Sequence, residues 1–250
     1  MRCICPQSDE VPPWVGSAQR AAPSHLRSLT CHGRRFMQVE RTRLVQRIVD
    51  MPQTVRYLTH PQVQVDPSKE VPRWSLNAIG RARVAALAEN LGLLKDTRRV
   101  VSSDETKALE TARPLASALK VTLEVRPAMH ENDRSATGFL PPDEFERVAD
   151  QFFANPSENV RGWESAEHAQ QRILTEVLSC LSNHSVGDVL FVGHGGVGTL
   201  LFCALAGHAI DRRFDQGPGG GGCWFGFDLQ DRSPLQGWQS MEKLVLVNDQ

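Results

Sequence analysis

Residues 189–196 read VLFVGHGG, which is four apolar residues followed by a glycine, a histidine and two glycines. A run that is apolar at every position is typical of a strand covered on both faces of a parallel sheet. A second short run, at residues 55–58, is followed by Thr59-His60-Pro61. Because the carboxyl ends of parallel strands meet at one edge of a sheet, we expect His60 and His194 to face each other across one crevice.

From residue 54 onward, short apolar runs alternate with longer segments in which apolar residues recur every three or four positions. This alternation predicts helices on both faces of a central sheet, and hence a three-layer α/β/α fold with a mostly parallel sheet. Predicted strands lie at 54–58, 100–101, 121–125 and 189–192, followed by a hairpin of 223–229 with 239–247. Predicted helices lie at 75–94, 104–119, 142–153, 164–181 and 196–206.

The overall composition sets limits on the class of protein. The chain has 250 residues and a formal net charge of -1, which does not suggest a surface for nucleic acid or for a membrane. No apolar run approaches the roughly 18 residues of a spanning helix. The six cysteines are scattered and do not resemble a secreted disulfide framework. We therefore expect a cytoplasmic protein.

Residues 1–50 differ from the rest of the chain. They contain eight arginines, no lysine and four acidic residues, a net charge of +4, with several prolines. Such a segment is predicted to be a disordered extension of a domain at 51–250, although a translation start at Met51 and a transit peptide are alternatives. The acidic residues Asp9 and Glu10 weaken the transit-peptide interpretation. Cys3, Cys5 and Cys31 fit no common zinc spacing.

Four signals occur in an order that resembles the histidine phosphatase superfamily, with its phosphoglycerate mutase-like fold. The first is Thr59-His60-Pro61 after a strand, and the last is Gly193-His194-Gly195-Gly196. Between them lie the segment SSDETKALETA at 102–112 and the lone Glu131. The resemblance covers residues 54–228, and the order and spacing of the signals are more specific than any one of them.

The resemblance implies a role for each of these residues. His60 would be the nucleophile that forms a phosphohistidine. His194, most usefully as imidazolium, would donate hydrogen bonds to the phosphoryl oxygens, and so would the helix start at Gly195. Glu131, with Asp133 as the alternative, would protonate the leaving oxygen and later activate water. No metal or other cofactor is implied.

The chain departs from the family pattern at its cationic positions. Thr59 stands where the family has an arginine, and Lys107 replaces a second arginine, so one hydroxyl and one ammonium replace two guanidinium groups. Both remain predicted substrate-binding residues. A further cation must then complete the site or the site is slow. We favour Arg134, close to Glu131, over Arg73. Pro61 also replaces a glycine and removes an N–H donor.

Two classes of function therefore remain open. One is a phosphomonoester hydrolase that acts on a small phosphorylated metabolite. The other is a relative with an impaired site that binds an anionic ligand or a protein partner. Mutase activity is a weaker third option, because it requires tight retention of a bisphosphate. Residues 130–163 are expected to set the specificity, and the sequence does not indicate the substrate or the oligomeric state.

Overall fold

The computed structural model describes residues 53–184 and 186–245, and the predicted extension at 1–50 lies outside the described residues. The chain forms a six-stranded sheet in the order β3-β2-β4-β1-β5-β6. The strands are β1 (Thr54–Thr59), β2 (Thr97–Ser102), β3 (Leu123–Val125), β4 (Asp188–Gly193), β5 (Cys223–Asp228) and β6 (Gln239–Ser240). The first four run parallel to one another, β5 is antiparallel to β1, and β6 is antiparallel to β5. The mostly parallel sheet is thus confirmed.

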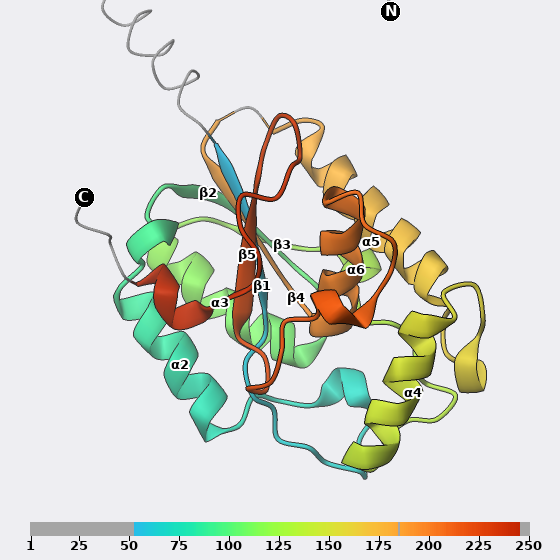
Figure 1. Ribbon diagram of the computed structural model, residues 1–250. Helices are drawn as coiled ribbons and strands as arrows, with labels where there is room; N and C mark the ends of the chain where they lie inside the picture. The colour runs from blue at the N-terminus through green and yellow to red at the C-terminus, as the bar shows by residue number, and fades with distance from the viewer. Residues whose placement is uncertain (1–52, 185, 246–250) are drawn as a thin grey trace, which may run out of the picture. The chain divides into compact units, whose positions relative to one another are not determined.

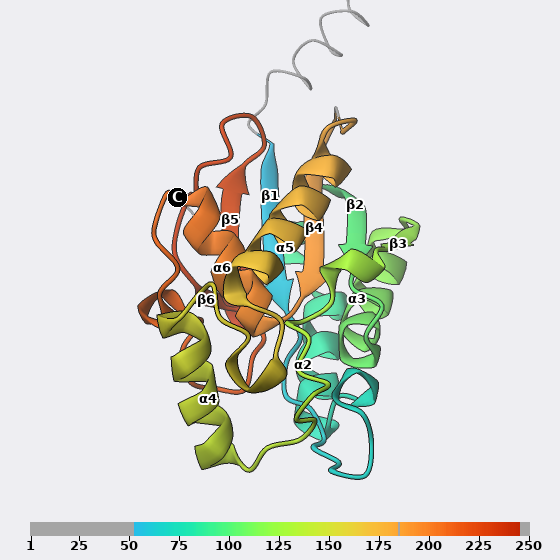
Figure 2. The ribbon, with the colours of Figure 1, turned by 90° about the vertical axis from the view of Figure 1, so that its right-hand side faces the viewer.

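Helices cover both faces of this sheet (Figures 1 and 2). They are α2 (Ala78–Glu89), α3 (Thr106–Leu119), α4 (Pro142–Ala154), α5 (Ala166–Leu181) and α6 (Gly195–Leu205). On β4, Leu190 packs with α2 and α3, whereas Phe191 packs with α5 and α6. Because alternate residues of a strand point to opposite faces, a continuously apolar strand serves two cores. This confirms the three-layer architecture.

Two helix ends follow from local chemistry. The Asn77 side chain accepts a hydrogen bond from Gly80 N at 2.9 Å and so caps α2, which begins later than predicted. The helix also ends earlier than predicted, and a 3-10 turn at Gly92–Leu94 follows it. After α6, Gly207 adopts a φ of +66°, which is the left-handed conformation that glycine permits at a helix end.

The carboxyl ends of β1 and β4 point towards the end of the domain where α4 lies (Figure 2). The glycines at 217 and 219–222 all have positive φ, and they bring this loop against the backbone that follows β1. Gly222 N donates to His60 O at 3.0 Å, and a side chain at Gly221 would collide with the same carbonyl. The glycine loop therefore closes one side of the candidate site.

The predicted second strand of the hairpin is short, because a 3-10 helix begins at Met241.

Candidate active site

The two predicted histidines meet at the carboxyl edge of the sheet. Thr59 of β1 is paired in register with Gly193 of β4, so the residue after each strand occupies the same level. His60 N donates to Gly193 O at 2.9 Å. The two imidazole centroids are 5.3 Å apart, and the ring planes are inclined by 68°. The two rings are adjacent, as predicted, but only His60 lines the cavity at this edge, so they do not face each other across it.

The half-buried His60 ring is held in one tautomer. Its Nδ1 lies 2.8 Å from Pro61 O. Because a carbonyl oxygen only accepts, Nδ1 carries the proton and Nε2 carries the lone pair. Burial, with a contribution from the nearby Lys107 ammonium, lowers the pKa of His60 to about 4. At neutral pH the ring is thus an uncharged imidazole whose Nε2 makes no hydrogen bond within the described residues.

His194 has a different environment. Its side chain is fully buried, and Nε2 lies 2.9 Å from Ser103 Oγ and 3.5 Å from Glu105 Oε1. Burial lowers the pKa of His194 well below its ordinary value, although the Glu105 carboxylate opposes this. The structure therefore does not support the imidazolium form that we expected, because the cost of desolvating the charge exceeds the attraction of one carboxylate. Tyr57 Oη fixes the His194 backbone by accepting from N at 3.0 Å and donating to O at 3.2 Å.

A buried ion pair stands behind His194. The Lys107 ammonium contacts the Glu105 carboxylate and donates to Val71 O at 3.1 Å. Glu105 also accepts from Glu131 N at 2.8 Å. Burial disfavours the Glu105 carboxylate, but His194, Lys107 and this N–H together lower the pKa of Glu105 to about 2. The charge of Lys107 is therefore neutralised by Glu105.

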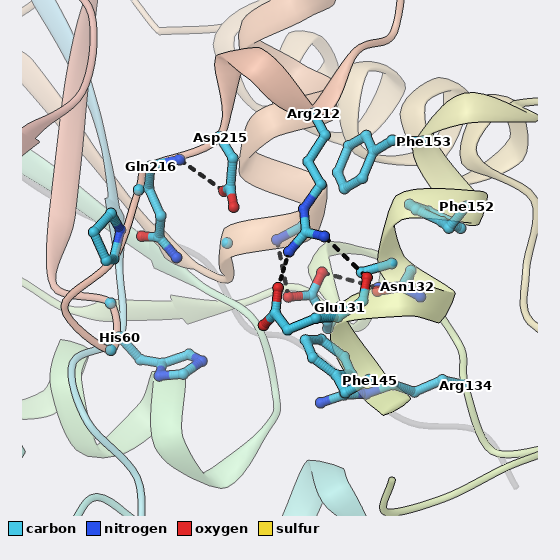
Figure 3. A pocket seen from close by; sticks show the side chains of 18 of the residues that line it. His60, Glu131, Asn132, Arg134, Phe145, Phe152, Phe153, Arg212, Asp215 and Gln216 are labelled. Atoms are coloured by element: carbon cyan, nitrogen blue, oxygen red, sulfur yellow. Dashed lines mark hydrogen bonds and ion pairs between the residues drawn. The ribbon is translucent and has the colours of Figure 1, made fainter. Parts of the chain in front are cut away.

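A cavity of about 470 Å³ opens at this edge of the sheet. In Figure 3, His60 lies on one side of the cavity and the aromatic residues of α4 on the other, with Glu131 between them. Four of the predicted site residues line the cavity, namely His60, Glu131, Arg134 and Gly195. The other three, Thr59, Lys107 and His194, lie behind its walls.

The Glu131 carboxylate caps the start of α6. It accepts from Gly196 N at 3.1 Å and from Val197 N at 2.9 Å. We expected these N–H groups to be available to a phosphoryl group. Instead, Gly195 N is the donor of this first turn that has no partner among the described residues. The carboxylate thus occupies part of the positive end of the helix dipole.

The loop that carries Glu131 is fixed by Arg172 of α5. Its guanidinium donates to His130 O at 2.9 Å, to Ala128 O at 2.8 Å and to the Glu164 carboxylate at 2.7 Å. Glu164 in turn accepts from Asp133 N at 3.1 Å. The Asp133 side chain itself is exposed and bonds to Ser135 N, so it does not reach the cavity.

Arg134 lines the cavity and carries a positive charge that no described carboxylate pairs with. Its Cζ lies 4.8 Å from the centroid of the Phe145 ring, and it forms no ion pair with any described residue. Its Nε is buried without a hydrogen-bond partner, and burial lowers the pKa of the guanidinium. The alternative, Arg73, is exposed and bonds to Glu70 at 3.2 Å. The geometry therefore favours Arg134 over Arg73 as the cation that lines the same cavity as His60.

Thr59, which stands where the family has an arginine, forms hydrogen bonds within the protein. Thr59 Oγ1 is buried, donates to Gln216 Oε1 at 2.7 Å and accepts from Cys223 N at 3.0 Å. This orients the Gln216 amide nitrogen towards Gly195, where an added side chain would collide with it. Thr59 therefore positions an amide donor at the start of α6.

The sequence model of the histidine phosphatase superfamily (branch 1) matches residues 62–231, which is more than half of the chain. The chain belongs to this superfamily. The match begins just after His60, where the residues depart from the family pattern. No curated protein matches the chain by sequence.

Solved structures of other histidine phosphatases share the fold. A mycobacterial glucosyl-3-phosphoglycerate phosphatase in complex with inorganic phosphate is 21% identical, with a TM-score of 0.60, over 75% of this chain and 94% of that one. A phosphoserine phosphatase variant from Entamoeba histolytica, in complex with phosphoserine, is 13% identical, with a TM-score of 0.63, over 78% of this chain and all of that one. At sequence identities this low, the structural similarity shows a shared fold alone.

Several residues of this candidate site carried no recognisable signal in the sequence. Gln216 and Asp215 follow a 3-10 turn without a motif, and Asn132 is adjacent to Glu131. The Asn132 side chain is only 8% exposed, and its Nδ2 has no hydrogen-bond partner within residues 53–184 and 186–245, so it offers a donor to the cavity. The aromatic residues of α4 were placed correctly in a helix, but their periodicity indicates only a buried face. Among the described residues there is no cluster suited to a metal ion and no helix able to span a membrane.

Proposed function

We propose that the protein is a phosphomonoester hydrolase that works through a phosphohistidine on His60. The observation that carries the proposal is the state of this ring: it is uncharged, its Nδ1 proton is held by Pro61 O, and its Nε2 is free in a cavity that also contains Glu131 and Arg134. A neutral imidazole with one nitrogen fixed as donor is prepared for nucleophilic attack by the other.

In the first step, His60 Nε2 attacks phosphorus, the N–P bond forms and the bond to the ester oxygen breaks. The departing alkoxide takes a proton from Glu131, which must enter this step protonated. In the second step the Glu131 carboxylate takes a proton from water, the oxygen of that water attacks phosphorus and the N–P bond breaks. Inorganic phosphate is released and both side chains return to their starting states.

Three donors that line the cavity with His60 are assigned to the phosphoryl oxygens. Arg134 supplies the positive charge, and Gly195 N and the Gln216 amide supply neutral donors. His194 is not among them, because its side chain has no exposed surface and does not line the cavity. Ser103 Oγ accepts from Glu105 N at 3.2 Å and can donate its own proton to His194 Nε2, which leaves the ring proton on the buried, unpaired Nδ1. We assign Lys107 to neutralising Glu105 rather than to the substrate.

The position of Glu131 favours the second candidate function, a relative that binds an anion without turning it over. Two N–H groups of α6 stabilise its carboxylate form, whereas a general acid needs the protonated form. Hydrolysis therefore requires a phosphoryl group to displace Glu131 from the helix start. A binding protein does not require this exchange.

Incubation with aryl and alkyl phosphomonoesters separates the two candidates. The hydrolase releases inorganic phosphate and, after rapid acid-free quenching, carries acid-labile phosphate that is absent from His60→Ala. A binding protein shows saturable, phosphate-competed binding with neither release nor labelling. Both results are interpretable only with folded protein, so the circular dichroism of wild type and variant serves as the control.

We also propose that residues 51–250 carry the whole activity and that the protein works in a reducing compartment such as the cytoplasm. The first point is supported by the family match, which lies within this range. The second is supported by the described cysteines, Cys180, Cys203 and Cys223, which are free thiols.

A further inference from the structure

The charged residues around the cavity are paired unequally. Arg212 of the 3-10 turn Arg212–Phe214 contacts the carboxylates of both Glu146 and Asp150 on α4, and it also donates to Glu146 O at 3.0 Å. One guanidinium thus faces two carboxylates. Arg134, in contrast, has no ion pair with a described residue. Of the two lining arginines, only Arg134 is available to an incoming anion.

Apart from the two arginines, the charged side chains that line the rest of the cavity are carboxylates. Asp215 uses Oδ1 to accept from Thr199 Oγ1 at 3.1 Å and from Gln216 N at 2.7 Å, and it has no cationic partner among the described residues. Asp215 and Glu146 both line the space. A ligand with a second anionic group, in addition to the one beside Arg134, would meet carboxylates and no unpaired cation.

The wall opposite the glycine loop is apolar. The centroid of the half-exposed Phe145 ring lies 6.0 Å from that of Trp163, and the centroids of Trp163 and Phe152 are 6.1 Å apart. Ala149 and Phe153 extend this surface along α4. Aromatic rings bury large apolar areas and prefer other rings as neighbours. This wall, from here on the α4 wall, suits a ring or another apolar group and offers few partners to a sugar acid or an amino acid.

We propose that the cavity selects phosphomonoesters with a single anionic group and an uncharged, ring-bearing alcohol. The phosphoryl group lies between His60 and Arg134, and the alcohol packs on the α4 wall. This inference rests on the proposed function, because it takes the His60 end of the cavity as the phosphoryl site.

Inert phosphonates test this selection without requiring turnover. We compare benzylphosphonate with 3-phosphonopropionate, which replaces the ring by a carboxylate, by isothermal titration calorimetry with inorganic phosphate as competitor. Benzylphosphonate is expected to bind about tenfold more tightly, corresponding to one apolar group buried and one repulsion avoided. Equal affinities, or a preference for the carboxylate, would overturn the inference.

The pairing of Arg212 provides a gain-of-function test. In Glu146→Gln/Asp150→Asn the guanidinium loses both carboxylate partners and keeps its bond to Glu146 O. We expect 3-phosphonopropionate to bind about threefold more tightly, within the range of partly exposed ion pairs. Glu144→Gln is the matched control: it lies on the same helix and releases Arg161, which does not line the cavity. An unchanged affinity in the double variant, or an equal gain in Glu144→Gln, would contradict the charge argument.

The α4 wall has its own matched pair. Phe145→Ala should weaken benzylphosphonate about fivefold while changing inorganic phosphate less, since it removes an aromatic contact. Phe214 is the control, because it is also half-buried, carries Arg213 at 4.7 Å over its ring and does not line the cavity. Equal losses in Phe145→Ala and Phe214→Ala would overturn the assignment of the wall.

These outcomes distinguish the inference from the proposed function. If benzylphosphonate is preferred and phenyl phosphate is not hydrolysed, the selectivity stands and the protein is a binding protein. If phosphomonoesters are hydrolysed with no preference for uncharged alcohols, the hydrolase stands and the inference fails. If neither phosphonate binds and phosphate does not either, both are overturned.

Discussion

His60 and His194 are the same residue type, at the ends of neighbouring strands and in register, yet their surroundings are opposite. His60 lies in the wall of a cavity, and its hydrogen-bond partners among the described residues are all backbone groups. His194 has no exposed surface and lies against Ser103 and the Glu105–Lys107 pair. The topology thus places both rings together, and the second layer of side chains decides which one can reach a ligand.

The largest expected effect is on the exposed member of the pair. His60→Ala should lower phosphomonoester turnover by roughly a thousandfold or more, because the nucleophile is removed. Its free energy of unfolding should change by no more than about 1 kcal/mol, since the ring is half-exposed. Turnover is measured with phenyl phosphate and unfolding with urea. Near-normal turnover in His60→Ala would remove His60 from the chemistry.

Substitutions in the buried ion pair behind His194 should lower the free energy of unfolding. Lys107→Met leaves the Glu105 carboxylate buried without its cation, and we expect a loss of about 3–5 kcal/mol of unfolding free energy. The double variant Lys107→Met/Glu105→Leu removes both charges and should recover much of that loss. Urea denaturation of both variants checks this. If the single variant is as stable as wild type, the pair does not hold the layer behind His194.

Arg134 gives a smaller effect on the open side. Arg134→Ala should weaken the binding of inorganic phosphate by about 1.5–3 kcal/mol, the contribution of a charge-assisted hydrogen bond. Arg73→Ala is the matched control, because Arg73 is exposed and pairs with Glu70. The inhibition constant of phosphate is the measurement. Equal inhibition constants in wild type and Arg134→Ala would exclude Arg134 from the phosphoryl site.

The two rings also predict a particular pH dependence. His60 has a pKa of about 4 in the folded protein, against an ordinary value of 6.5, and His194 is lowered as well. The unfolded chain therefore binds more protons below pH 6.5, so stability should fall as the pH decreases from about 6.5 towards 4. NMR titration of the histidine rings, with His60→Asn for assignment, checks the shift. A His60 pKa near 6.5 would contradict the desolvated environment.

The smallest effect is expected outside the described residues. A protein that starts at Met51 should keep its activity and melt within about two degrees of the full chain, because a segment with little apolar periodicity buries little surface. Differential scanning calorimetry and phenyl phosphate turnover test this. A loss of several degrees would mean that the segment packs on the domain.

The sequence predicted where both histidines lie, because each one directly follows a short, apolar strand of a parallel sheet. It also predicted α4. It could not predict that His194 is sealed from the cavity, since this depends on Ser103, Glu105 and Lys107 meeting from another strand end. The Glu131 cap on α6 was equally inaccessible, because a carboxylate in a polar loop has no sequence signal for its partner.

The same reasoning explains the outcome for the replaced arginines. The sequence showed that Thr59 and Lys107 are not arginines and that a compensating group was needed. Arg134 could be named because it is close to Glu131 in the chain. Gln216 could not, because it is brought to Thr59 by the glycine loop across a separation of 157 residues.

The central claim is that His60 Nε2 accepts the phosphoryl group, and phosphorus–nitrogen connectivity in the trapped protein tests it most directly. Protein labelled with ¹⁵N-histidine is mixed with phenyl phosphate, quenched in alkali and analysed by ³¹P–¹⁵N NMR, with His60→Asn as the control. The account predicts one phosphohistidine, bonded through Nε2 and absent from the variant. Phosphate on Nδ1, on His194 or on no histidine during active turnover would contradict it.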